Sequence, residues 1–269
     1  MVSDITNDAR GILAPDVGLK RFNLERCEPS GVVGRLVDRY WVVRWELPAG
    51  EGFDQHVWPH PVTNVVFENG AATAGGVTTR LFTRRLEGRG RAVGVMFRPG
   101  GFRPLVARRM RTLTDRTIAF DDLIGPRATA LARAVENAAD DQVAVGLIDA
   151  LLTELVPSAR HPAETTVRLA ETAATDRRIV RVEQLAQLAR VSARTLQRRF
   201  ADHVGISPKA VIRRYRLFDA AEAARHDEID WAGLAVTLGY ADQAHLIRDF
   251  RTAIGMTPAS YARACRPSG

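Results

Sequence analysis

Leu196-Gln197-Arg198-Arg199-Phe200 and, 50 residues later, Leu246-Ile247-Arg248-Asp249-Phe250 repeat one short pattern, Leu-x-Arg-x-Phe, and this repeat decides the fold of the C-terminal half. Each copy is followed by a glycine and a hydroxyl residue joined to proline, in Gly205-Ile206-Ser207-Pro208 and Gly255-Met256-Thr257-Pro258. Self-similarity at a fixed offset indicates one structural unit that occurs twice.

An amphipathic segment and a tight turn precede each copy. The apolar residues of the amphipathic segment recur at i, i+3, i+4 and i+7, which is helical spacing. The two stripes are Val182, Leu185, Ala186, Ala189 and Trp231, Leu234, Ala235, Leu238. Ser192 and Asp242 occupy the N-cap positions of the next helices, and Gly239 stands where a helix would stop. The repeat therefore predicts two helix-turn-helix units, at about 182–204 and 231–254.

The second helix of each unit is predicted to expose a polar face. At about 100° per residue, Leu196, Phe200 and Val204 share the inner face. The outer faces then carry Arg194, Arg198 and Ala201 with Gln197 beside them, and Ala244, Arg248 and Arg251 with Ile247 at the flank. Such a helix fits the DNA major groove, where arginine pairs with guanine, glutamine with adenine, and an aliphatic group touches a thymine methyl.

The segment between the units reads as one helix from Pro208 to about Arg225. About 18 residues would span roughly 27 Å. Successive major grooves on one side of DNA lie about 34 Å apart, and bending closes the difference, so both second helices reach the same duplex. Lys209, Arg213 and Arg214, with Arg216, are predicted to contact phosphates.

The charge agrees with a nucleic-acid partner. The net charge is +7, and 36 of the 38 basic residues are arginine. The chain is predicted to be globular and cytoplasmic, because Cys27 and Cys265 form no CxxC pair and neither a signal pattern nor an apolar run of membrane-spanning length occurs.

The N-terminal part has a different pattern. Residues 36–45, 62–67 and 92–97 read as short strands separated by turns, which predicts a small β-barrel or sandwich over about 20–118. Helical spacing then predicts two helices within 127–156, and 157–162 reads as a linker. The fold class is therefore α+β with two domains. The first is a β-rich domain over 1–157, with helices from about 120, and the second is an all-α domain of about seven helices over 163–266.

Residues 163–265 resemble the AraC/XylS family of bacterial transcription regulators, through the doubled Leu-x-Arg-x-Phe…Gly-x-Ser/Thr-Pro pattern and Leu238-Gly239-Tyr240. The resemblance implies promoter DNA and RNA polymerase as partners and a small β-rich N-terminal domain, which we expect to be cupin-like. An activator role is a further expectation, and repression stays open. The resemblance also implies base contacts from Arg194, Gln197, Arg198, Gln243, His245, Ile247 and Arg248. Gln243 and His245 rest on the resemblance, whereas Arg251 comes from the helix geometry. Leu246-Ile247 departs from the family, which often has an aromatic residue there.

Several alternatives remain open. His56 and His60 are candidate metal ligands of a cupin-like enzyme, but no third ligand is evident. Ten arginines between 80 and 111 form a solvated face, an anionic effector pocket or a phosphate-contacting patch. Arg198 and Arg248 also have potential intramolecular partners in Asp202 and Asp249.

We expect no cofactor and no enzyme activity, because no Gly-rich phosphate loop, nucleophile elbow or catalytic carboxylate pair occurs. A small-molecule effector of the N-terminal domain and a homodimer through the helices of 127–156 are further expectations, and a ligand-independent architectural DNA binder is the remaining rival.

Overall fold

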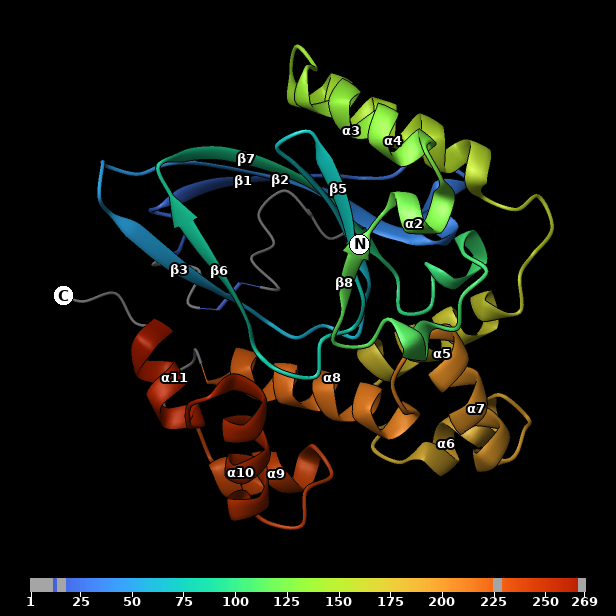
Figure 1. Cartoon of the computed structure of the whole chain (residues 1–269). Helices are drawn as coiled ribbons and strands as arrows, with labels where there is room; N and C mark the ends of the chain where they lie inside the picture. Colours follow the sequence, from blue (N-terminus) through green and yellow to red (C-terminus); the bar gives the residue numbers. More distant parts are fainter. Residues whose placement is uncertain (1–11, 14–17, 225–228, 266–269) are drawn as a thin grey trace.

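The computed structural model of the chain describes residues 12–13, 18–224 and 229–265. A β-rich N-terminal part lies on a helical C-terminal part (Figure 1). Arg225, where the long helix was predicted to end, lies outside the described residues, as do parts of the predicted domain ranges, including residue 266. The domain limits remain predictions.

The N-terminal part contains one six-stranded antiparallel sheet and one two-stranded sheet. The large sheet has the order β1 (Phe22–Cys27), β2 (Val37–Glu46), β7 (Arg89–Phe97), β4 (Asn64–Glu68), β5 (Ala71–Gly75) and β8 (Thr117–Ala119). The small sheet pairs β3 (Gly52–Val57) with β6 (Phe82–Glu87). The predicted β-rich domain is confirmed, but no closed barrel forms among the described residues, because β1 and β8 remain the edges of an open sheet.

Two glycines of β7 fix how β2 and β7 pack. Gly94 and Gly90 lie opposite Trp41 and Trp45 of β2 in the antiparallel register. The two indole rings occupy the space that a Cβ would need, so only glycine fits at these strand positions. The pairing keeps both tryptophans close to the sheet.

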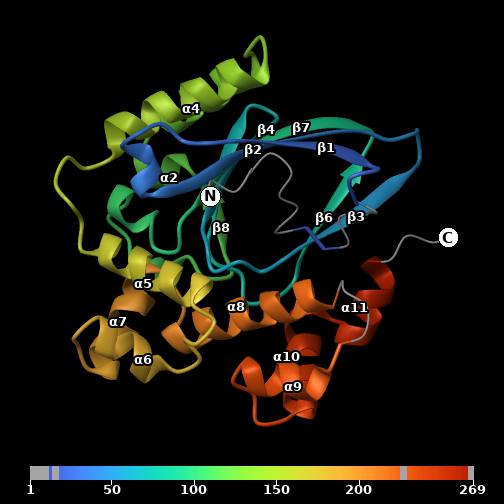
Figure 2. The same cartoon turned by 180° about the vertical axis from the view of Figure 1, so that it is seen from behind.

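Helices α3 and α4 cover one face of the large sheet (Figures 1 and 2). The short helical elements of this region are η2 (Val33–Arg35), η3 (Arg103–Leu105), η4 (Met110–Thr112), α2 (Asp121–Ile124), α3 (Arg127–Glu136) and α4 (Asp141–Leu155). Asp140 caps α4 by accepting a hydrogen bond of 2.8 Å from Val143 N. The two helices predicted within 127–156 are therefore confirmed.

The C-terminal part has seven helices among the described residues, as the sequence predicted. They are α5 (Ala163–Thr175), α6 (Val182–Leu188), α7 (Ala193–His203), α8 (Pro208–Ala223), α9 (Trp231–Thr237), α10 (Gln243–Ile254) and α11 (Pro258–Cys265). Helix α8 has 16 residues, a length of about 24 Å. It runs between the α6–α7 pair and the α9–α10 pair in both views (Figures 1 and 2).

Candidate nucleic-acid interface

Helices α7 and α10 begin at matched caps. Ser192 Oγ accepts a hydrogen bond from Thr195 N at 3.2 Å, and Asp242 Oδ1 accepts one from His245 N at 2.7 Å. Each cap satisfies a backbone donor that the first helical turn leaves without a carbonyl partner. Both predicted N-caps are therefore confirmed, and they fix where each second helix starts.

The turns before these caps also match. Val191 N donates to Ala186 O at 3.1 Å, and Tyr240 N donates to Ala235 O at 2.9 Å. Each turn passes through a left-handed residue, which is Arg190 with φ of 52° in the first unit and Gly239 with φ of 81° in the second. Gly239 ends α9 as predicted, because glycine adopts this conformation without steric cost.

The inner faces of α7 and α10 form the cores of the two units. Leu196 and Phe200 of α7, and Leu246 and Phe250 of α10, have no exposed surface. Ile254 is equally buried, and Val204, just after α7, is almost so. The predicted division into an inner and an outer face is correct for both helices, so packing fixes which side chains remain available to a partner.

The outer faces of both helices are open to solvent. Exposed side chains on them are Arg194, Gln197 and Arg198 of α7, and Gln243, His245, Arg248 and Arg251 of α10. Ile247 is half-buried at the flank of α10. The imidazole of His245 packs edge-on against the Tyr240 ring, with 5.1 Å between ring centroids. This contact lies at the start of the helix whose sequence departs from the family pattern.

Arg198 and Arg248 form no intramolecular ion pair within the described part of the chain. Asp202 instead faces Arg103 and Arg109 of the N-terminal part, at 3.8 Å each. Asp249 pairs with Arg213 of α8 at 2.7 Å. The alternative that assigned these aspartates to Arg198 and Arg248 is therefore wrong.

The predicted phosphate contacts divide into three environments. Lys209 is exposed in the first turn of α8. Arg213 is half-exposed but tied to Asp249. Arg214 donates to the carbonyl oxygens of His60, at 3.3 Å, and Thr78, and burial lowers its pKa to about 10. The phosphate role predicted for Arg214 does not fit this arrangement, because its guanidinium is turned towards the N-terminal part.

Arg216 likewise faces the protein interior. It is 1% exposed, donates to Ala173 O and lies 3.2 Å from Asp219. The accompanying prediction of a phosphate contact from Arg216 is therefore incorrect.

Residues 185–264 match a family described as helix-turn-helix domain. A putative AraC-like transcription regulator of Streptomyces lividans is 34% identical over 82 residues, which are 30% of this chain and 27% of that protein. The HTH-type transcriptional activator RhaS of Escherichia fergusonii is 33% identical over 76 residues, 28% of this chain and 27% of that protein.

Residues 185–264 are an AraC-type helix-turn-helix domain. This confirms the family resemblance predicted from the repeat. The chain spans less than a third of the length of these curated relatives. Among solved structures, the C-terminal domain of AraT, a response regulator from Geobacillus stearothermophilus, is 25% identical with a TM-score of 0.36, covering 41% of this chain and 92% of that one.

The region preceding the AraC-type domain matches a family without an assigned role. Residues 25–119 match a domain of unknown function, DUF6597. The metal alternative has no support in the described residues, where no group of three His, Cys, Asp or Glu side chains is placed to hold an ion. His56 Nδ1 lies 2.9 Å from Thr83 Oγ1, and the His60 ring packs 5.8 Å from that of Phe218.

The ten arginines between 80 and 111 do not converge on one site. Arg84 pairs with Glu68 at 2.5 Å, and Arg91 pairs with Asp141 at 2.8 Å. Arg98 reaches the helical C-terminal part of the chain, where it pairs with Glu171 of α5. The arginines are thus divided among several elements, which argues against a single anionic pocket formed by all of them.

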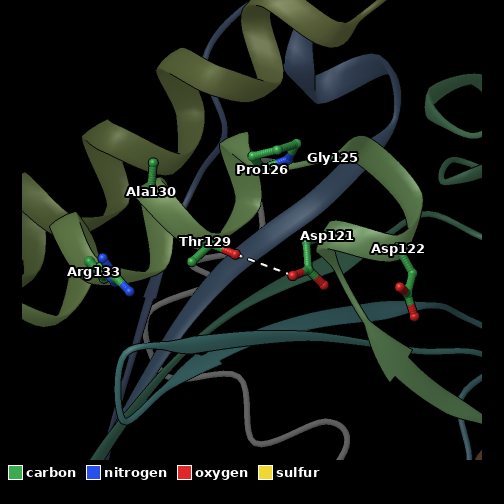
Figure 3. A pocket seen from close by; sticks show the side chains of 7 residues that line it. All are labelled: Asp121, Asp122, Gly125, Pro126, Thr129, Ala130 and Arg133. Atoms are coloured by element: carbon green, nitrogen blue, oxygen red, sulfur yellow. Dashed lines mark hydrogen bonds between the residues drawn. The ribbon is translucent and has the colours of Figure 1, made fainter.

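A surface hollow of about 490 Å³ lies where α2 meets α3 (Figure 3). Its lining residues are Asp121, Asp122, Gly125, Pro126, Thr129, Ala130 and Arg133. Thr129 Oγ1 donates to Asp121 Oδ2 at 3.2 Å, as the dashed line in Figure 3 shows. Two carboxylates and no aromatic side chain line this hollow, so it has no aromatic group on which a ligand could stack. The predicted effector stays a prediction.

A buried histidine supports the C-terminal end of α7. His203 Nδ1 lies 2.7 Å from Thr166 Oγ1 of α5, and the His161 ring is 6.2 Å away. Burial lowers the pKa of His203 to about 4, with smaller contributions from neighbouring charges. The imidazole is therefore neutral at pH 7 and acts as a packing group.

No sequence pattern predicted the contact between Trp58 and the second unit. Its indole lies edge-on to Phe218 of α8 at 5.5 Å and to Phe250 of α10 at 6.3 Å. These partners are far away along the chain, and an aromatic residue beside prolines equally suits a sheet core.

In the described part of the chain, no helix combines the length and apolar character needed to cross a bilayer.

Proposed function

We propose that the chain is a sequence-specific DNA-binding transcription regulator that places α7 and α10 in successive major grooves of one duplex. The observation that carries this proposal is the pair of outward arginines, Arg198 and Arg248. They occupy the same position in two equivalent units, are exposed, and have no ion-pair partner among the described residues. Buried pattern residues on the opposite faces hold both helices in place.

The chemistry of the side chains indicates which residues would contact bases and which would contact phosphates. Arg194, Gln197 and Arg198 of α7, with Gln243, His245, Ile247, Arg248 and Arg251 of α10, would contact base edges and adjoining phosphates. Lys209 would neutralise a phosphate beside the first groove. Helix α8 is shorter than the separation of about 34 Å between successive grooves, so lateral offset of the helices or DNA bending completes the fit.

Replacing each outward arginine in the full chain tests the proposal. Arg198→Ala and Arg248→Ala should each weaken specific binding by about 1–3 kcal/mol and relax base preference within one half of the target. The target itself comes from selection of genomic fragments by the purified protein. Arg133→Ala is the matched control, because Arg133 is exposed on α3, far from both units. Unchanged base preference in both variants would contradict the proposal.

The biological setting extends the same proposal. We place the protein in the cytoplasm, on promoter DNA, in contact with RNA polymerase and without enzyme activity; RhaS, an activator by name, supports an activating role. A small-molecule effector of the N-terminal part is the signal that we expect. A homodimer is supported by exposed apolar side chains one turn apart on α4, Val143 and Leu147.

A further inference from the structure

The outer stripe of α7 leads towards the N-terminal part of the chain. Arg194, Arg198 and Asp202 follow one another at intervals of four residues, so they lie along one side of the helix. Arg194 and Arg198 are exposed, whereas Asp202 meets Arg103 and Arg109 at 3.8 Å each. The acidic end of the stripe is therefore covered by arginines from the other half of the molecule.

These arginines belong to a segment that is fixed against the end of α7. Residues 103–111, here named the arginine loop, contain η3 and the first two residues of η4. Just beyond the loop, Thr114 Oγ1 donates to Gly205 O at 2.8 Å. A Cβ on Gly205 would lie 3.1 Å from Met110 O, and the φ of Gly205 is 102°. The close approach requires glycine here, so the loop and the helix end are packed together.

The arginine loop has an excess of exposed positive charge. Arg108, Arg109 and Arg111 are exposed, and residues 103–111 contain no acid. The side chain of Arg109 is 65% exposed although it faces Asp202. Arg108 and Arg111 make no ion pair with any described residue. Three guanidinium groups thus face solvent beside the helix that we assign to the first groove.

We propose that the arginine loop binds the DNA phosphate backbone that flanks the groove read by α7. The inference rests on the proposed function, because it places α7 in DNA first. A recognition helix contacts bases through its N-terminal residues, so its C-terminal end approaches the backbone at the edge of the groove. Guanidinium groups donate two parallel hydrogen bonds to phosphate oxygens, which suits them to this position. The N-terminal part then contributes to DNA affinity directly.

The salt dependence of binding gives the test. Each phosphate contact contributes about 0.9 to the slope of log K against log salt concentration. The full-length double variant Arg108→Gln/Arg111→Gln should therefore lower the magnitude of the slope by about 2 and keep the selected DNA motif. Arg89→Gln/Arg133→Gln is the matched control, since it removes the same charge from exposed arginines at the start of β7 and on α3.

The control must keep the wild-type slope, since an equal decrease in both double variants would show an effect of net charge alone and overturn the inference. An unchanged slope in Arg108→Gln/Arg111→Gln would also overturn it. Shortening the duplex on the α7 side should weaken the wild type and leave this variant unaffected. The two proposals are distinguishable: if the wild type selects no motif, the proposed function fails, whereas a motif without the slope change defeats only the role of the arginine loop.

Discussion

The two helix-turn-helix units have the same internal construction but different attachments to the N-terminal part. The first unit is attached mainly by polar contacts, in which Asp202 faces Arg103 and Arg109 and Gly205 O accepts from Thr114, and Val77 of the N-terminal part joins its apolar cluster. The second unit packs on an aromatic side chain, Trp58. The repeated sequence pattern therefore determines the internal fold of each unit. The contacts of a unit with the N-terminal part determine which conditions destabilise that unit.

Removing the indole of Trp58 should produce the largest difference in stability between the two units. Trp58 is 5% exposed, and Trp58→Ala should lower the free energy of unfolding by about 3–5 kcal/mol, through lost contacts and the cavity left behind. Limited proteolysis should then cleave within 229–265 before it cleaves within 182–204. Trp45→Ala is the control, because Trp45 is also buried but belongs to a sheet cluster. Equal protection of the two units in Trp58→Ala would show that Trp58 does not anchor the second.

Acidification should weaken the first unit selectively. The pKa of His203 is lowered from 6.5 to about 4 in the folded protein, so the unfolded chain binds more protons between these values. The stabilisation by neutral His203 is complete above pH 6.5 and is lost as the pH falls towards 4, by about 3 kcal/mol in total. Denaturant unfolding at several pH values should show this loss. The second unit has Ala253 at the equivalent position.

The variant His203→Gln should reduce the pH dependence of the first unit between pH 6.5 and 4, since glutamine carries no titrating group. The part due to His161, whose pKa is also lowered by burial, should remain. A wild-type profile that is already flat in this window, or a pH dependence that is equally large in the variant, would contradict the role assigned to His203.

Substitutions of the two left-handed turn residues should have the smallest effect on the stability of the units. Gly239→Ala should destabilise the second unit by about 1–2 kcal/mol, because alanine disfavours a positive φ and its Cβ would lie 2.6 Å from Val180 Cβ. Arg190→Gly should change the stability of the first unit by less than about 1 kcal/mol, because relief of the strained backbone is offset by the greater freedom of the unfolded chain. Thermal unfolding measures both, and equal effects would show that the two turns are not used differently.

The sequence predicted what depends on local pattern. The caps at Ser192 and Asp242, the stop at Gly239 and the inner faces of α7 and α10 follow from spacing within a few residues, and the structure confirms them. Arg214 shows the limit. Its acceptors, His60 O and Thr78 O, lie 154 and 136 residues away, so no local pattern distinguishes it from an exposed arginine.

The sheet was predicted less completely than the helices. Short strands with turn residues between them were evident, but whether a sheet closes depends on which strands pair, and strand pairing is a long-range property. Here β7 pairs with both β2 and β4, while β1 and β8 remain at the edges. The contact between the arginine loop and α7 could not be predicted for the same reason, since Arg103 and Asp202 are far apart in sequence.

Guanine methylation interference on a selected DNA fragment tests the central claim most directly. We predict two short blocks of interference in the major groove, about one helical turn apart on the same side of the duplex. Arg198→Ala should abolish interference in one block, and Arg248→Ala should abolish it in the other. A single block, or two blocks that both variants affect equally, would contradict the account in which α7 and α10 read adjacent grooves.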